Sequence, residues 1–576
     1  NSTASLIDLA NYFENFFSSI VNSFSFLNLN VCFNFIDFLF LNNSYLQSLT
    51  NSDKFKIKKF ELSEVLAALR ELDKNSSPGA VGIETIIFNK CADALGPTLT
   101  NLFNLCLEKG SIPDEWKVAH VTPIYKGKGL KSELNNYRPI SVISPIAKAF
   151  ESLLSGQIKS FLECRNILHE SQFGFRAWRS CELALNSMID DWRDVLDLNE
   201  ELMAIFLDLS KAFDTVDHQL LLKKLSFYNF DLSVIELLRN YLTNRFIRVN
   251  INGQLSKKEK VIVGVPQGSV LGPLLFIVFI NDLAHLPLSS KLLLFADDTT
   301  VFLSGSCVND LIKKLSDDLL KIKEWLSHNR LIINLSKTHA ISFKTNNSIS
   351  LNCGNDIIEF VNETRLLGVI IDNKLKFSSH INFLCKKASS KAYLIKKSLF
   401  LFDQKFRFSL FKLFIIPHFD YCSTLFTYLK NKGDRDRLSS CFNNCVYRIL
   451  NIKLFNLTEF EQFKILYLKH KILPLVYRQL LHFSCFVYRL ILRKNCKLYN
   501  KLIVSKSKTR SSYIIPKFRT NVKKYSFTTL STKMLNLFIN KYNSDAIQKN
   551  GERKALNTYL IENINKYYNN LLSEIT

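Results

Sequence analysis

The sequence predicts an α+β protein that contains more than one packed unit. Its 576 residues are too many for one small domain, and 47% of them are hydrophobic, which suffices for several cores. Strand-like apolar runs at 202–207 and 291–303 stand among amphipathic helical segments such as 60–72. The presence of both periodicities indicates a mixture of helix and sheet.

Two adjacent carboxylates interrupt the apolar stretch Lys291-Leu-Leu-Leu-Phe-Ala-Asp-Asp-Thr-Thr-Val-Phe-Leu303. The runs on either side predict a β-hairpin with Asp297 and Asp298 at its tight turn, and their side chains pointing in different directions. Two acids in an apolar setting repel each other, and burying them unpaired is costly. In isolation such a pair also fits a solvated bend. With the rest of the sequence it predicts a divalent metal site.

Two further segments support a binding site around these carboxylates. Leu202-Met-Ala-Ile-Phe-Leu-Asp-Leu-Ser-Lys-Ala-Phe-Asp-Thr-Val-Asp-His218 is an apolar strand that ends in Asp208, which precedes Asp297 by 89 residues. The fold must therefore bring the two acids together. Between them, Val261-Ile-Val-Gly-Val-Pro-Gln-Gly-Ser-Val-Leu-Gly-Pro273 has glycines spaced where the backbone would approach a flat ligand closely.

These three segments, in this order, resemble the palm of a reverse transcriptase. The Phe-Ala-Asp-Asp, Gly-Val-Pro-Gln-Gly-Ser and Phe-Leu-Asp-Leu-Ser-Lys-Ala-Phe-Asp boxes are similar to those of non-LTR (LINE-type, jockey-like) retrotransposons. The resemblance implies a right-hand polymerase of fingers, palm and thumb, with a helical, basic C-terminal extension. A group II intron or other retroelement reverse transcriptase is the rival within this class. A decayed copy that only binds RNA is the alternative outside it.

The resemblance also implies a catalytic constellation. Asp208, Asp297 and a backbone carbonyl near Leu209 would hold two Mg²⁺ ions, with Mn²⁺ as an alternative metal, and Asp298 would support the site more loosely. Lys337 would donate a proton to the leaving pyrophosphate, although a solvent-facing lysine fits its position nearly as well. The ions would serve target-primed reverse transcription in the intact element.

Other residues are assigned to the substrates by the same resemblance. Arg138 beside Pro139 is held on a stiff backbone, which suits bidentate phosphate binding. Phe213, five residues after Asp208, would be a steric gate against a 2′-hydroxyl, with a core phenylalanine as the alternative. The full nucleotide-binding set is Lys126, Arg138, Arg176, Phe213, Gln267 and Gly268. The template and primer set is Gln172, Phe173, Pro266, Leu367, Gly368, Lys387 and Lys391.

Charge is unevenly distributed along the chain. Residues 381–576 carry 36 Lys and Arg against 10 Asp and Glu, a net charge of +26, so the rest of the chain carries −2. A near-neutral catalytic part joined to a basic part is what an enzyme that holds a polyanion would show.

The expected domain division follows the order of a right-hand polymerase. It consists of a linker remnant without assigned function (1–52), fingers and N-terminal extension (53–200), palm (201–380, with the reverse transcriptase domain at about 117–372), thumb (381–480) and a basic C-terminal region (481–576).

The expected partners are an RNA template, a DNA primer or target, and deoxynucleoside triphosphates. Residues 24–41 approach the length of a membrane span, but their Asn and Asp residues would be costly in lipid, and the ten apolar residues 271–280 suit a buried helix. Thirteen cysteines without regular spacing do not predict a disulfide framework. We therefore expect an intracellular protein, nuclear or cytoplasmic, that is not secreted and has no membrane partner. The sequence leaves its oligomeric state open.

Overall fold

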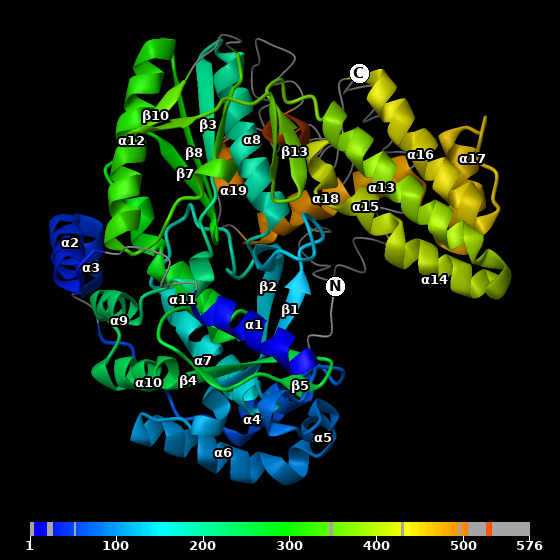
Figure 1. Ribbon diagram of the computed structural model, residues 1–576. Helices are drawn as coiled ribbons and strands as arrows, with labels where there is room; N and C mark the ends of the chain where they lie inside the picture. Colours follow the sequence, from blue (N-terminus) through cyan, green and yellow to red (C-terminus); the bar gives the residue numbers. More distant parts are fainter. Residues whose placement is uncertain are drawn as a thin grey trace.

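A computed structural model describes residues 5–19, 27–50, 53–344, 350–427, 431–493, 497–504 and 526–532 (Figure 1). It contains both helices and sheets, which confirms the α+β class. The largest sheets have four and five strands, and helices pack around both. Much of the predicted C-terminal region 481–576 lies outside the described residues.

The central sheet has four antiparallel strands in the order β7-β8-β3-β9. Their bounds are β7 (Lys291–Phe295), β8 (Asp298–Gly305), β3 (Glu201–Leu207) and β9 (His339–Ser342). Ile205 in β3 pairs with Val301 of β8 on one side and with Ala340 of β9 on the other. The predicted hairpin at 291–303 is therefore confirmed, and β3 is an interior strand of this sheet.

Both faces of β3 are buried, which explains why it appears in the sequence as an unbroken apolar run. Met203 and Ile205 belong to the core that includes helix α12 (Val308–His328), whereas Ala204 and Phe206 belong to the core of helix α8 (Cys181–Asp197). Successive strand residues point to opposite faces, so covering both faces requires apolar residues at every position.

The second sheet has the order β2-β1-β4-β5, with β6 also pairing with β4. Strands β1 and β4 are parallel, and the other pairs are antiparallel. Asn252 (φ 51°) and Gly253 (φ 90°) form the tight turn between β4 and β5, which requires two positive φ values. The strands are β1 (Val118–Tyr125), β2 (Tyr137–Val142), β4 (Arg245–Ile251), β5 (Gln254–Leu255) and β6 (Glu259–Val261).

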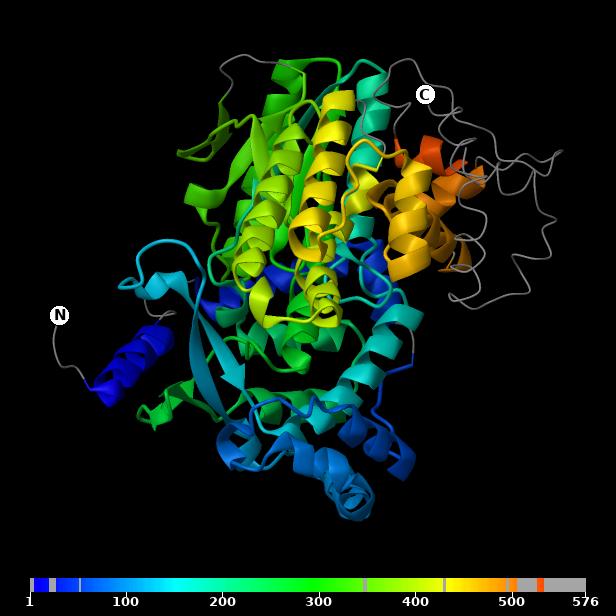
Figure 2. The same ribbon diagram turned by 90° about the vertical axis from the view of Figure 1, so that its right-hand side faces the viewer.

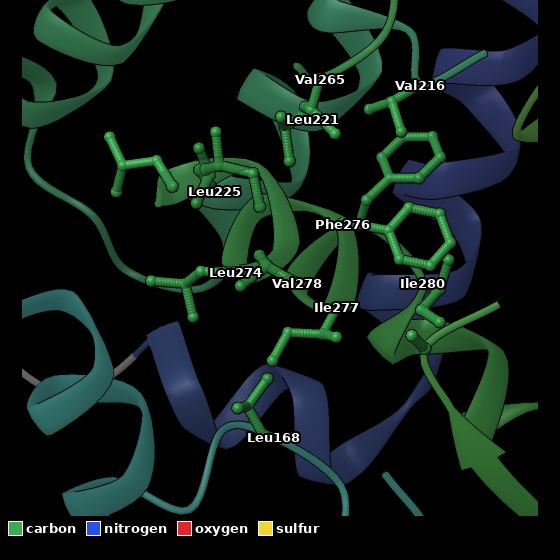
Figure 3. Close-up of a cluster of buried hydrophobic side chains, with 14 of the residues drawn as sticks. Leu168, Val216, Leu221, Leu225, Val265, Leu274, Phe276, Ile277, Val278 and Ile280 are labelled. Carbon is green, nitrogen blue, oxygen red and sulfur yellow. The ribbon is translucent and has the colours of Figure 1, made fainter. Parts of the chain in front are cut away.

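A short, wholly apolar helix, α11 (Leu271–Phe279), occupies the interior next to α7 and α9. Figure 3 shows its side chains, among them Leu274 and Phe276, meeting Leu221 and Leu225 of α9. The prediction of a buried helix here is confirmed. Glu151 of α7 accepts hydrogen bonds from the backbone N–H groups of Val270 and Leu271 (2.7 and 3.1 Å), which satisfies donors at the start of α11.

The helices of the N-terminal part of the chain pack around the second sheet and around α7, α9 and α12. Helix α1 packs on β4, β5 and β6, and α4, α5 and α6 pack near α7 (Figure 1). The bounds are α1 (Leu6–Ser18), α2 (Leu29–Asn42), α3 (Ser44–Thr50), α4 (Leu62–Glu71), α5 (Thr85–Lys90), α6 (Ala92–Lys109), α7 (Pro145–Cys164), α9 (His218–Phe227) and α10 (Leu232–Leu242). The helix predicted at 60–72 is thus present as α4.

Two small hairpins precede the C-terminal helices in the chain. Helices α13 and α16 contact each other, and Figure 2 shows them side by side in yellow-green and yellow. The hairpins are β10 (Leu351–Cys353) with β11 (Asp356–Ile358), and β12 (Glu363–Leu366) with β13 (Val369–Asp372). The helices are α13 (Ser378–Lys397), α14 (Gln404–Phe414), α15 (Ile416–Asp420), α16 (Lys432–Leu450), α17 (Glu459–Phe463), α18 (Leu475–Arg493) and α19 (Lys497–Val504).

Two features of the described part of the chain concern membranes and disulfides. None of its helices combines the length and hydrophobicity that a membrane crossing requires. Its cysteines are all free thiols. The apolar stretch 24–41 is described from residue 27 onward and contains most of α2, whose Cys32, Ile36 and Phe40 are buried against the rest of the protein.

Candidate active site

Three carboxylates gather at one end of the central sheet. Leu207 of β3 pairs with Thr299 of β8, so continuing the antiparallel register by one residue places Asp208 beside Asp298. Phe295 pairs with Asp298, which leaves Ala296 and Asp297 as the two turn residues. Asp298 is therefore the first residue of β8 rather than part of the turn. The pairing of β3 with β8 brings together acids that are 89 positions apart.

The carboxylates perturb one another. Burial raises the pKa of Asp298 to about 6, and the charges of Asp297 and Asp208 add to this shift. The pKa of Asp297 is also raised, mainly by burial and then by Asp208, while Arg138 acts in the opposite direction. A bound cation would compensate the negative charges of these carboxylates.

Positive side chains lie around the acids. Lys337, in the 3₁₀ helix Leu335–Lys337, places Nζ 3.5 Å from Oδ2 of Asp208, and its side chain is 66% exposed. Lys126 follows β1, and its pKa is lowered by burial and then by the charges of Lys337 and Arg138. Arg138 is exposed on β2 and forms no ion pair with another described residue. Lys126, Arg138 and Lys337 thus surround the carboxylates with positive charge.

The donor set fits Mg²⁺ in its chemistry. Carboxylate oxygens are the hard ligands that Mg²⁺ prefers, and Asp208, Asp297 and Asp298 supply them at one end of the central sheet. Across the described residues, no three His, Cys, Asp or Glu side chains form a closed metal-binding group. Leu209, the predicted backbone ligand, follows Asp208 and pairs with Ile333 in an isolated bridge.

The glycine-rich segment 264–268 packs against protein backbone on one side, with Gly264 buried and Gly268 exposed. Gly268 has φ 117°, and a Cβ there would lie 2.3 Å from the carbonyl oxygen of Ser141. At Gly264 (φ 87°) a Cβ would meet the Asp214 carbonyl at 2.7 Å. These glycines allow close contact with β2 and with the segment after β3, and their approach to a flat ligand stays a prediction.

Gln267 lies between the two glycine contacts and has a definite partner. Its Nε2 lies 2.8 and 2.9 Å from the carboxylate oxygens of Asp214, and its backbone oxygen accepts a 2.7 Å hydrogen bond from Ser141 N–H. Phe213, the neighbour of Asp214, stacks on Phe276 with ring centroids 4.3 Å apart and remains partly exposed. Phe213 therefore rests on the core of α11 without being enclosed by it.

The structure corrects the assignment of Gln172 and Phe173 to template contact. Gln172 has no exposed surface, and its Oε1 accepts hydrogen bonds from Gly174 N–H (2.8 Å) and Ala296 N–H (3.1 Å). Phe173 is buried and donates its N–H to the carbonyl of Leu294 (2.7 Å). Both residues support the carboxylate hairpin from within and cannot touch a template directly.

The assignment of Arg176 to the triphosphate is corrected as well. Its side chain is 6% exposed and paired with Glu163, where Nε and Nη2 contact the two carboxylate oxygens. Nη1 donates to the carbonyls of Leu168 and His169. These contacts occupy the guanidinium, so Arg176 anchors its loop to α7 and the preceding turn.

Leu367 and Gly368, which are predicted to contact the primer, lie in the hairpin of β12 and β13. Leu367 (φ 45°) and Gly368 (φ 84°) form its turn, and the hydroxyl of Tyr421 donates a 2.6 Å hydrogen bond to the Leu367 carbonyl. On α13, Lys387 lies 4.7 Å from the Phe383 ring and Lys391 lies 6.0 Å from the Phe414 ring. Pro266 precedes Gln267 and lines a cavity with it.

Comparison with known proteins gives the same assignment. The family model described as reverse transcriptase (RNA-dependent DNA polymerase) matches residues 126–371, a range that contains all three carboxylates. Residues 126–371 therefore carry a reverse transcriptase domain, and the chain is similar to polymerases of non-LTR retrotransposons. Over 384 residues it is 29% identical to the probable RNA-directed DNA polymerase from transposon X-element of Drosophila melanogaster, covering 63% of this chain and 41% of the relative.

Two further relatives are also similar to parts of this chain. The RNA-directed DNA polymerase from mobile element jockey of Drosophila melanogaster is 27% identical over 329 residues, covering 56% of this chain and 36% of the relative. The Pol polyprotein from type-1 retrotransposable element R2 of Popillia japonica is 25% identical over 214 residues, covering 36% of this chain and 28% of the relative. The chain spans about two fifths or less of these curated relatives.

Sequence reasoning missed two residues of the site. Asp214 stands inside the quoted Asp208 box, but no spacing rule predicts that Gln267 is its partner. Tyr421 carried no signal, because its contact with Leu367 joins segments 54 residues apart.

Proposed function

We propose that the chain is an RNA-directed DNA polymerase that extends a primer 3′-hydroxyl with deoxynucleotides. The observation that carries this proposal is the meeting of Asp208, Asp297 and Asp298 at one end of the central sheet, faced by Arg138. This arrangement suits phosphoryl transfer, which depends on positioned charges more than on covalent chemistry. The competing proposal, a decayed copy that only binds RNA, predicts no extension.

The right-hand architecture assigns a role to each part of the fold. The central sheet, with the surrounding residues 201–380, is the palm. The second sheet and its helices, within 53–200, supply the fingers and N-terminal extension, although β4, β5 and β6 come from the palm range. Helices α13 to α18 form the thumb and the start of the basic extension, divided near residue 480. Residues 1–52, with α1 and α2, have no assigned role in catalysis.

Asp208 and Asp297 would hold two Mg²⁺ ions, with Asp298 and the Leu209 carbonyl in support. When bound, these ions lower the pKa of the primer hydroxyl and stabilise the leaving pyrophosphate. The carboxylates orient the reacting groups at the end of a rigid sheet. Lys337, 3.5 Å from Asp208, is placed to donate a proton to pyrophosphate or to neutralise its charge.

The substrates would meet the remaining side chains of the site. Arg138 and Lys126 bind the triphosphate, because both are exposed cations next to the acids. Phe213 lies under the sugar and excludes a 2′-hydroxyl. Leu367 and Gly368 contact the primer, and Lys387 and Lys391 contact the phosphate backbone of the duplex. In an intact element this reaction would begin at a nicked target.

Primer extension on an RNA template tests the proposal. Wild-type protein with Mg²⁺ and deoxynucleotides is expected to extend the primer, and Asp297→Asn is expected to lose more than about a hundredfold in rate, since losing a metal ligand costs several kcal/mol of barrier. Template affinity should stay within about twofold. Asp231→Asn, at the partly exposed N-cap of α10, is the matched control. Extension by Asp297→Asn at the wild-type rate would refute the proposed site.

A further inference from the structure

Three cysteine side chains gather between helices α13 and α16, and the proposed mechanism gives them no role. Cys385 lies on α13, and Cys441 and Cys445 lie about one turn apart on α16. Cys441 and Cys445 are buried, whereas Cys385 is partly exposed. Figure 2 shows the two helices side by side. The packing of these helices therefore brings Cys385 to a pair of cysteines more than fifty positions later in the chain.

Cys441 is the central member of this cluster. Its Sγ lies 3.6 Å from the backbone oxygen of Cys385 and 3.6 Å from Oγ of Ser389, both on α13. Hydrogen bonds from the thiols of Cys385 and Cys445 lower the pKa of Cys441, against the opposing effect of burial. The same interactions raise the pKa of Cys385 and of Cys445. Cys441 is therefore the thiolate of the cluster, and its two neighbours are thiols.

The arrangement favours a bond between two sulfurs over a metal site. Within the part of the chain that the structure describes, no three Cys, His, Asp or Glu side chains form a closed metal-binding group. Cβ atoms four residues apart on one helix are about 5–6 Å apart, beyond the roughly 3.5–4.5 Å that a disulfide spans. Cys441 and Cys445 therefore suit a disulfide poorly, and Cys385 on the facing helix is the better partner for Cys441.

We propose that Cys385 and Cys441 are a peroxide-oxidisable pair that closes into a disulfide between α13 and α16. Hydrogen peroxide is the oxidant, and the partly exposed Cys385 leaves this small molecule a route to the cluster. The Cys441 thiolate attacks one peroxide oxygen, the O–O bond breaks, and a sulfenic acid and a hydroxide form. The hydroxide takes the proton of the Cys385 thiol and becomes water.

The second step closes the disulfide. The Cys385 thiolate attacks the sulfenic sulfur of Cys441, the S–S bond forms, and the S–O bond breaks with hydroxide as the leaving group. The two sulfurs together lose two electrons, and the peroxide is reduced to one water and one hydroxide. A thiol reductant such as dithiothreitol reverses the bond by thiol–disulfide exchange.

The disulfide would restrain the helix that carries two proposed duplex contacts. Lys387 and Lys391 are exposed on α13. Cys385 and Ser389 face α16, and at about 100° per residue Lys387 lies roughly 200° around the helix from Cys385, so the lysines face away from α16. A bond to α16 holds them in the position of the duplex-free protein, and we expect this to weaken duplex binding. This effect rests on the proposed polymerase function, whereas formation of the disulfide does not.

Disulfide mapping of the full chain tests the pair. Reduced protein is treated with a small excess of hydrogen peroxide, free thiols are blocked with iodoacetamide, and tryptic peptides are analysed by mass spectrometry without reduction. Trypsin releases Cys385 in peptide 377–386, and Cys441 with Cys445 in peptide 438–448. We expect a link between these peptides in wild type and Cys445→Ala, and none in Cys385→Ala or Cys441→Ala. Cys106→Ala, which removes a buried cysteine of α6, is the control and should keep the link.

The wild-type map decides the outcome without depending on the folding of any variant. Peptide 438–448 with an internal disulfide would show that Cys441 pairs with Cys445 and would overturn the assignment of Cys385. Complete alkylation of both peptides after peroxide treatment would refute the pair altogether.

Affinity for a primer–template duplex, measured by fluorescence anisotropy, tests the restraint on α13. It should fall a few-fold when wild type is oxidised, return with dithiothreitol, and stay unchanged in peroxide-treated Cys385→Ala. Equal affinities of oxidised and reduced wild type would refute the restraint. Failure of the reduced protein to extend any primer would overturn the polymerase function, and a linked peptide pair in the same sample would still support the disulfide.

Discussion

Asp298→Asn should stabilise the metal-free protein, because the carboxylate is held where its charge is unfavourable. Its pKa is raised to about 6 by burial and by Asp297 and Asp208, whereas an unfolded-chain Asp has a pKa of about 3.9. The difference corresponds to at most about 3 kcal/mol at pH 7.5. Since the group keeps some solvent contact and its repulsion is shared with Asp297, we expect a gain of about 1–3 kcal/mol in the free energy of unfolding.

The pH dependence identifies the cause. The folded-state pKa is raised, so the destabilisation is complete above about pH 6 and decreases as the pH falls, to about half its value at pH 5. Thermal melting with a chelator at pH 7.5 and pH 5 measures both values, with Asp231→Asn as the control. Stability of Asp298→Asn equal to or below that of wild type at pH 7.5, or an equal gain at both pH values, would refute this reasoning.

Two further predictions concern residues that position the site. Gln172→Leu removes the buried acceptor for Gly174 and Ala296 N–H, and we expect a stability loss of about 1–3 kcal/mol and a lower kcat at unchanged template affinity; full activity in melting-matched samples would return Gln172 to a passive core role. Tyr421→Phe removes the hydrogen bond to the Leu367 carbonyl, and we expect primer affinity, measured by fluorescence anisotropy, to fall a few-fold with dNTP KM unchanged; unchanged primer affinity would contradict a link between α15 and the hairpin.

The parts of the fold that the sequence predicts are those with strong local patterns. The hairpin around Asp297 follows from short apolar runs that flank a turn, and the Asn252–Gly253 turn follows from two residues that tolerate positive φ. The burial of α11 follows from its length and lack of polar residues. Asp208 was placed next to Asp297 by resemblance, and only the register of β3 with β8 supplies the physical reason.

The predictions that failed concern partners that come from distant segments. The resemblance assigns Arg176 to the triphosphate, but its guanidinium forms an ion pair with Glu163 on α7. The resemblance assigns Gln172 to the template, but its amide oxygen accepts a hydrogen bond from the backbone of a turn 124 residues away. A polar side chain looks the same in a sequence whether its partner is a ligand or the chain itself, so tertiary contacts decide between the two.

The central claim, that catalysis depends on a metal held by Asp297, is tested most directly by changing the metal preference of that position. Asp297→Cys replaces a hard oxygen ligand with a softer thiolate, which binds Mg²⁺ poorly and accepts softer ions such as Mn²⁺ or Cd²⁺. Primer extension on an RNA template is measured with each ion for wild type and variant. We predict that the variant is inactive with Mg²⁺ and regains part of the wild-type rate with Mn²⁺ or Cd²⁺. Wild-type activity of Asp297→Cys with Mg²⁺ would contradict the account.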